Sequence, residues 1–214
     1  MHYDLKNDIF NKLIALHLKK GTPIGSKILK KIYFRQLADS TIRLYLKRLV
    51  LENYLMNINK GTGRIPTDKG WKYYLEINVN KVNINNWGNL NKYSLMELIE
   101  VVADKFNICY LLENKTKLIE GGFEYVVRNV ELEDKNKLIE LFRFFKEVKK
   151  YINKILEKDD IKVLIGGELK LAKSSLFSVL GLRKREHKII FVGVKRLNYP
   201  VVYNLLDKII KKRL

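Results

Sequence analysis

The chain has a single cysteine, Cys109, among its 214 residues. One cysteine excludes an intramolecular disulfide framework and a cysteine-based zinc site. A reducing, cytoplasmic location is therefore expected, with Cys109 in the core, since it stands in the apolar stretch NICYLL. Long apolar runs are absent too, and the longest are far too short to span a bilayer. The start, MHYDLKNDIF, lacks a signal-peptide pattern, so we expect no membrane association.

Acidic residues are scarce relative to basic ones. The chain has 23 aspartates and glutamates against 42 lysines and arginines, a formal net charge of +19. Such an excess is usual for a protein that binds polyanions, although a lysine-rich genome would also produce it. The first 80 residues hold 15 of the basic and six of the acidic residues, so this part is the more basic per residue. Composition therefore favours a nucleic-acid partner.

Patterns that carry enzyme chemistry are missing. No His, Asp and Glu residues stand at metal-ligand spacing, and there is no phosphate loop. The pair Gly166-Gly167 is more typical of a β-turn, and the acids Glu131, Glu133 and Asp134 suit the start of a helix. An enzyme acting on nucleic acid would need a carboxylate cluster or a nucleophile–base pair. We expect no catalytic residue, no metal and no cofactor, and hence no enzyme.

Apolar periodicity and turn residues predict the organisation of residues 1–77. Leu5, Ile9 and Leu13 recur at helical spacing, and Gly21 ends that helix. Ser26 is expected to cap a second helix, and Asp39 or Ser40 a third. The predicted elements are helices at Tyr3–Lys20, Ser26–Tyr33 and from Asp39 or Ser40 to Val50, a strand at Tyr54–Ile58, and a helix that follows Thr67 and Asp68. Three helices, a two-stranded hairpin and a closing helix form a winged helix-turn-helix.

The second helix of such a motif enters the major groove of DNA, with residues near its N-terminus on base edges and flanking cations on phosphates. Arg43 can pair with guanine or grip a phosphate. A solvated basic face is the alternative interpretation of this helix. The predicted DNA-binding residues are Ser26, Ser40, Thr41, Arg43, Leu44, Lys47, Lys60 and Arg64.

The stretch KGTGRIPTDKGWKYY, residues 60–74, is predicted to hold the tip of the hairpin and then, from Thr67 and Asp68, the start of the closing helix. Gly61 and Gly63 permit a tight loop with positive φ. Lys60 and Arg64 on that tip can reach a phosphate or the narrow minor groove. The alternative is a surface turn whose arginine is only solvated.

Residues 78–91 are asparagine-rich and are predicted to be a linker, followed by an α+β domain at 92–214. The sequence RKREHK, residues 183–188, is expected at a hairpin tip, where solvation is favoured over contact with DNA. Predicted helices are Ser94–Phe106, Asp134–Leu156 and Val201–Lys211, and predicted strands are Ile108–Leu112, Phe123–Val127, Lys162–Ile165, Ser175–Leu180 and Ile189–Val194.

Several of these stretches resemble the family of the heat-inducible transcription repressor HrcA. They are GTPIGS at 21–26, STIR at 40–43, LENYL at 51–55 and GRIPTDKG at 63–70, in the family's order, and the last is highly specific. Weaker similarity covers Gly121-Gly122, the helix from Asp134 to Lys158, IGGE at 165–168 and VKRLNY at 194–199. Family members are usually longer between about residues 92 and 121, and they usually have Asn-Glu where this chain has Leu44-Tyr45.

The resemblance implies a reduced GAF-like second domain, a homodimer, and repression of chaperone genes from an inverted-repeat operator of the CIRCE type. It also implies modulation by a GroEL-type chaperonin. The alternative function is a winged-helix regulator whose GAF-like domain binds a small effector. A ligand-dependent shift in melting temperature would distinguish the two.

Overall fold

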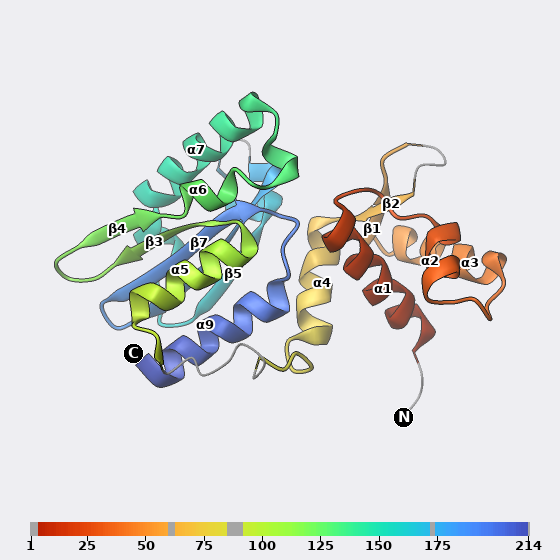
Figure 1. Ribbon diagram of the computed structural model, residues 1–214, viewed down its shortest axis with the longest axis horizontal. Helices are drawn as coiled ribbons and strands as arrows, with labels where there is room; N and C mark the ends of the chain where they lie inside the picture. The colour runs from red at the N-terminus through yellow and green to blue at the C-terminus, as the bar shows by residue number, and fades with distance from the viewer. Residues whose placement is uncertain (1–3, 60–62, 85–91, 172–173, 214) are drawn as a thin grey trace. The chain divides into compact units, whose positions relative to one another are not determined.

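The structure is a computed structural model that describes residues 4–59, 63–84, 92–171 and 174–213. The chain divides into two compact units, Met1–Ile77 and Asn78–Leu214. Both mix α-helices with antiparallel β-strands (Figure 1). The strand predicted at Tyr54–Ile58 is shorter than expected, at Leu55–Asn57. The N-terminal unit contains α1 (Leu5–Lys20), α2 (Ser26–Ile32), α3 (Asp39–Leu51), β1 (Leu55–Asn57), β2 (Arg64–Pro66) and α4 (Asp68–Asn78).

The ends of α1 follow ordinary capping chemistry. The Asp4 carboxylate accepts hydrogen bonds from the backbone N–H groups of Lys6 and Asn7, and Gly21 ends the helix in the left-handed region at φ 68°. The predicted caps of the next two helices are wrong. Gly25 and Ala38 occupy those N-cap positions, neither has a capping side chain, and Ser26 already lies inside α2.

The core of the N-terminal unit forms where the apolar stripes of α1 and α3 meet. On α3 the buried positions are Ile42, Leu46 and Leu49, whereas the predicted stripe member Val50 is only half-buried. Aromatic rings close the core: Tyr54 stacks on Tyr73 with ring centroids 4.3 Å apart. Further fully buried side chains of this unit are Ile9, Phe10, Leu13, Ile14, Ile24, Leu29, Leu55 and Trp71.

The C-terminal unit is built on a five-stranded antiparallel sheet with strand order β4-β3-β7-β6-β5. Its strands are β3 (Cys109–Glu113), β4 (Leu118–Gly121), β5 (Ile161–Ile165), β6 (Phe177–Lys184) and β7 (His187–Val194). Its helices are α5 (Leu95–Phe106), α6 (Phe123–Val126), α7 (Lys135–Lys150), α8 (Ile152–Ile155) and α9 (Tyr199–Arg213), with short 3-10 helices η3 (Val130–Leu132), η4 (Gly166–Leu169) and η5 (Ser174–Leu176).

Helices cover both faces of this sheet, with α5 and α9 on one face and α6 and α7 on the other (Figure 1). Alternate strand residues point to opposite faces, and the sheet is apolar on both. Cys109 and Leu111 of β3 face α7, where Phe144 packs on Phe177 of β6 with ring centroids 5.1 Å apart. The sheet is therefore the central layer of a three-layer α+β unit.

Two predictions for this unit are wrong, and one strand was missed. The strand expected at Phe123–Val127 is helix α6, because Gly122 at φ 80° turns the chain out of the sheet. The helix expected at Asp134–Leu156 is interrupted at Tyr151, which separates α7 from α8. Strand β4, on the sheet edge, was not predicted at all.

Candidate nucleic-acid interface

The hairpin of the N-terminal unit is tied to the turn between α1 and α2 by a two-residue bridge. The Ile24 N–H donates to the Arg64 carbonyl oxygen at 2.9 Å, and the Arg64 N–H donates to the Ile24 carbonyl oxygen at 3.0 Å. Gly63 makes this approach possible. Its φ is +102°, and a Cβ atom there would lie 2.8 Å from the Ile24 backbone carbon. Positive φ at Gly63 was predicted, whereas its contact with Ile24 was not.

The start of α4 packs against the residues that connect α3 to β1. The Thr67 hydroxyl donates to the Asn53 carbonyl oxygen at 2.7 Å and accepts from the Gly70 N–H at 2.9 Å. Thr67 therefore caps α4, as predicted. A Cβ atom on Gly70 would lie only 2.0 Å from the Tyr54 carbonyl oxygen. Both ends of the GRIPTDKG stretch thus need glycine for close backbone contact.

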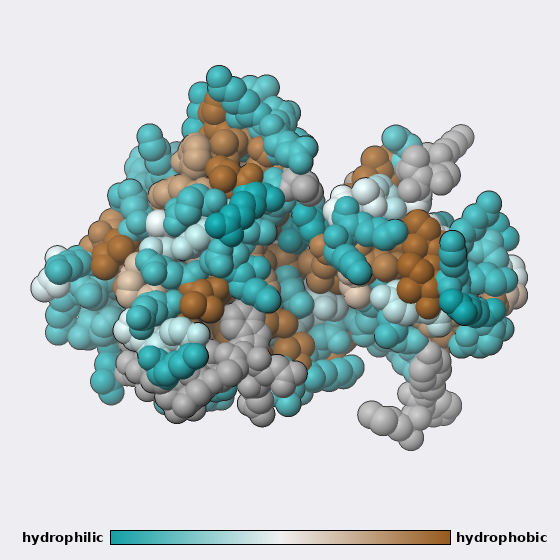
Figure 2. Space-filling model, viewed as in Figure 1, coloured by the Kyte–Doolittle hydropathy of each residue, from teal (hydrophilic) through white to brown (hydrophobic). Residues whose placement is uncertain are grey.

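The exposed face of α3 carries most of the predicted DNA-binding residues. Ser40, Arg43, Leu44 and Lys47 are exposed, and Thr41 is half-buried. Leu44 is 49% exposed, although it is apolar. Hydrophilic side chains cover much of the visible surface over α2 and α3 (Figure 2).

A hollow of about 510 Å³ brings together three of the predicted residues from separate segments. Ser26 comes from the first turn of α2, Arg43 from α3 and Arg64 from β2. Arg43 is 61% exposed and pairs with Asp39 of the same helix, with Nη2 3.2 Å from Oδ2. Of the other predictions, Lys60 lies outside the described residues, and the remaining α3 residues lie outside this hollow. Its full lining is Pro23, Gly25, Ser26, Lys27, Ile28, Arg43, Asn57, Gly63 and Arg64.

Arg64 differs from the other cations that line this hollow, because part of its guanidinium is buried. Its Nε atom is buried and has no hydrogen-bond partner among the described residues. Burial lowers the pKa of its guanidinium from the usual value, because a charged group loses hydration there. An arginine keeps its charge even so. The arrangement therefore holds a positive charge, with an unused donor, at the loop end of the hairpin.

The family model for the HrcA protein C terminal domain matches residues 78–202, more than half of the chain. The chain belongs to the HrcA family. Similar curated proteins carry the name heat-inducible transcription repressor HrcA. The one from Chlamydia muridarum (strain MoPn / Nigg) is 41% identical over 63 residues, 29% of this chain and 16% of that protein. The one from Protochlamydia amoebophila (strain UWE25) is 33% identical over 78 residues, 36% of this chain and 20% of that protein.

The aligned parts thus span at most a fifth of the length of these two HrcA relatives. Among solved structures, a hypothetical protein has a TM-score of 0.78 to this chain at 13% identity. The match covers 98% of this chain and 96% of that one. At such low identity it shows the fold alone.

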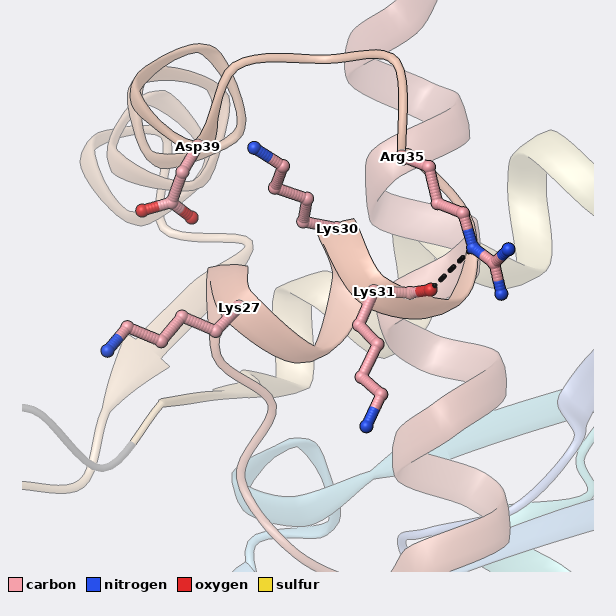
Figure 3. A pocket seen from close by; sticks show the side chains of 5 residues that line it. All are labelled: Lys27, Lys30, Lys31, Arg35 and Asp39. Carbon is pink, nitrogen blue, oxygen red and sulfur yellow. Dashed lines mark hydrogen bonds between the residues drawn. The ribbon is translucent and has the colours of Figure 1, made fainter.

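A second hollow, of about 670 Å³, lies beside the first on this HrcA-family chain and was not predicted (Figure 3). Four cations border it: Lys27, Lys30 and Lys31 of α2, and Arg35 just after that helix. Asp39 at the start of α3 completes the lining. The lysines stand in the sequence as SKILKKI. The lysines of that short helix were a sequence signal for this hollow. Only the apolar residues of the helix were used in the prediction, so the lysines were not selected as DNA-binding candidates.

The RKREHK stretch of the C-terminal unit does form a hairpin tip, between β6 and β7. Its first arginine, Arg183, donates from Nη1 to the carbonyl oxygens of Leu156 and Glu157. The Arg185 N–H donates to a carboxylate oxygen of Asp159 at 3.0 Å. Both arginines therefore take part in holding this turn against the segment before β5.

In the part of the chain that the structure describes, no group of three or more His, Cys, Asp or Glu side chains could hold a metal ion. Within the same ranges, no helix has both the length and the apolar character needed to cross a bilayer. His17 contacts the core. Its Nδ1 lies 2.9 Å from the Thr22 carbonyl oxygen, and the centroid of its ring lies 6.0 Å from that of the Trp71 ring.

Proposed function

We propose that this protein is a DNA-binding transcriptional repressor and that its N-terminal unit, residues 1–77, is a winged helix-turn-helix. The observation that carries the proposal is the hollow in which Ser26, Arg43 and Arg64 meet beside the exposed face of α3. In this proposal α3 is the recognition helix and the β1–β2 hairpin is the wing. The names of the similar curated proteins support the regulatory role.

The recognition helix would offer three kinds of contact. Ser40 and Thr41 near its N-terminus carry hydroxyls that can donate to phosphate oxygens, and Lys47 adds a charge nearly two turns further on. Arg43 suits a bidentate contact with guanine, because its exposed guanidinium pairs with a single carboxylate, Asp39, among the residues that the structure describes. Leu44 offers an apolar surface to a thymine methyl group.

The wing would grip the DNA backbone through Arg64. A half-buried guanidinium with an unused Nε donor gains most from an anion that brings its own acceptor oxygens, as a phosphate does. The backbone bridge between Ile24 and Arg64 fixes the distance from this charge to the first turn of α2. Lys60 would add a further phosphate contact.

The C-terminal unit, reached through the linker at 78–91, would be a reduced GAF-like domain that joins two chains. Its antiparallel sheet with order β4-β3-β7-β6-β5 and helices on both faces supports this assignment. A homodimer would place two recognition helices on one two-fold axis and so read an inverted-repeat operator of the CIRCE type. Heat would relieve repression by destabilising the fold or the dimer, and a GroEL-type chaperonin would modulate it.

Binding to an inverted-repeat duplex of the CIRCE type, compared with a scrambled duplex across a salt series, tests the proposal. We expect sequence-dependent binding whose logarithm falls steeply with the logarithm of salt concentration. Arg43→Ala should weaken operator binding by about 1–3 kcal/mol. Arg64→Ala should weaken binding to both duplexes alike, and Arg64→Lys should retain part of it. Absence of binding to every duplex at low salt would refute the proposal.

A hollow in the C-terminal unit supports the second candidate, a regulator that senses a small effector. Its volume of about 440 Å³ is that of a site for a small molecule. Tyr151 at the helix break lies on its wall, which also carries three lysines and two glutamates: Lys154, Lys162, Lys170, Glu147 and Glu168. The lysines outnumber the glutamates, so an acidic effector would suit this hollow. The test is to screen a panel of acidic metabolites for one that raises the melting temperature and changes operator affinity. If Lys162→Gln removed both effects, repression would be controlled by an effector rather than relieved by heat.

A further inference from the structure

We infer that α2 carries a cationic track that holds DNA phosphates beyond the groove entered by α3. The track consists of Lys27, Lys30 and Lys31 of α2 and Arg35 of the connection to α3. The inference rests on the proposed DNA-binding function. It adds a set of backbone contacts that extends the bound DNA past the base pairs read by α3.

The four side chains surround one open hollow, and their placement is set by a short helix. Lys30 extends from α2 towards the start of α3, where Asp39 lies, while Lys27 and Lys31 extend from other sides of the same helix (Figure 3). Arg35 Nε donates to the Lys31 carbonyl oxygen at 3.2 Å. That bond satisfies a carbonyl oxygen near the C-terminal end of α2 and holds the guanidinium beside the helix, with its terminal nitrogens directed outward (Figure 3).

The charge of the track is not balanced within the described residues. Asp39 is the only acid among the described residues that line the hollow, and its Oδ2 is already 3.2 Å from Nη2 of Arg43. None of the four cations forms an ion pair with any residue in the described ranges. Like charges around one hollow repel one another, and a bound polyanion removes that repulsion.

The track is continuous with the hollow that contains Arg64. Lys27 lines both hollows, so that cations follow one another from Arg64 past Lys27 to Arg35. A single small anion would neutralise one part of this row. A DNA strand presents a regular series of phosphates, and therefore matches a row of cations better than an isolated phosphate does.

The salt dependence of binding tests the track. The variant Lys27→Gln, Lys30→Gln, Lys31→Gln, Arg35→Gln should lower the slope of log K against log salt by about 0.9 for each phosphate that is no longer neutralised, or about 3 to 4 per protomer. The ratio of operator affinity to scrambled-duplex affinity should change little, because interactions with phosphates carry no sequence information. Lys27→Arg, Lys30→Arg, Lys31→Arg should keep the wild-type slope, and circular dichroism establishes that each variant folds.

The matched control removes the same charges from α7 of the C-terminal unit, with Lys135→Gln, Lys137→Gln, Arg143→Gln and Lys146→Gln. These side chains are all exposed, and their replacement should leave the slope unchanged. If the α2 variant kept the wild-type slope, or the α7 control reduced it as much, the track would be refuted while the proposed function stood. Failure of the wild-type protein to bind any duplex would refute both.

Discussion

Replacing Gly70 with alanine should destabilise the N-terminal unit, although Gly70 lies in a helix. Alanine in a helix interior is normally more stable than glycine by about 1 kcal/mol. Here the added Cβ atom would lie 2.0 Å from the Tyr54 carbonyl oxygen, where ordinary contacts begin at 3.4 Å. The obstacle is backbone rather than the end of a flexible side chain, so the first turn of α4 would have to move.

The size of the effect follows from what that movement breaks. The carbonyl of Tyr54 accepts the Thr67 N–H at 3.1 Å, and the Thr67 hydroxyl donates to the Asn53 carbonyl oxygen at 2.7 Å. Breaking both bonds costs about 1–3 kcal/mol, and forcing a methyl group into a packed site costs about 1–3 kcal/mol more. After the gain in helix propensity of about 1 kcal/mol is subtracted, we expect a net destabilisation of about 3 kcal/mol.

Trp71 provides the assay, because it is buried in the same unit and the chain has only one other tryptophan, Trp87. In a Trp87→Phe background, urea unfolding followed by fluorescence would report on the N-terminal unit. With a slope of about 1–2 kcal/mol per molar, Gly70→Ala should lower the midpoint by about 1.5–3 M. Gly25→Ala is the control, since nothing lies within 4 Å of its Cβ position. A midpoint for Gly70→Ala at or above the background value would refute the reasoning.

Gly63→Ala should weaken DNA binding measured by anisotropy, because φ is +102° and the new Cβ would press on the Ile24 backbone; unchanged affinity would contradict the bridge geometry. Replacing operator thymines one at a time by deoxyuridine should reduce binding at one position in each half-site, and Leu44→Ser should abolish that difference. Burial, and to a lesser extent Glu124, raises the pKa of the Cys109 thiol to about 12, so iodoacetamide at pH 8 should label the chain only after unfolding. Burial raises the pKa of Tyr110 to about 12 as well. Because an unfolded tyrosine ionises near pH 10, the free energy of unfolding should fall between about pH 10 and 12. In urea titrations across this pH range, Tyr110→Phe should reduce that fall.

Helices with one apolar stripe and a clear end were predictable from the sequence. Gly21 ends α1 at the expected residue, and Ser94 caps α5 with the reciprocal bond from Glu97 that such a sequence favours. Periodicity could not detect the break at Tyr151, because Val148 and Ile152 are buried on either side of it. The apolar pattern runs through α7 and α8 as if they were one helix.

Strand β4 escaped prediction because it is a four-residue edge strand in which no residue is fully buried. Leu118 is 42% exposed, and the strand is defined by its antiparallel pairing with β3, in which Leu112 lies opposite Ile119. The candidate site shows the same limit. Arg64 could be selected from its glycine-rich loop, but its buried Nε results from the bridge to Ile24, a contact between residues forty apart in the chain.

The bridge between Ile24 and Arg64 also bears on how such a protein can change over evolution. It is made entirely by main-chain N–H and C=O groups, which any residue but proline supplies. Position 64 can therefore exchange its side chain, and with it the proposed DNA contact, without loosening the hairpin. Gly63 has no such freedom, since any side chain there meets the Ile24 backbone. The attachment of the hairpin and the proposed phosphate contact are thus assigned to adjacent residues, so that the strength of DNA binding can change while the scaffold stays fixed.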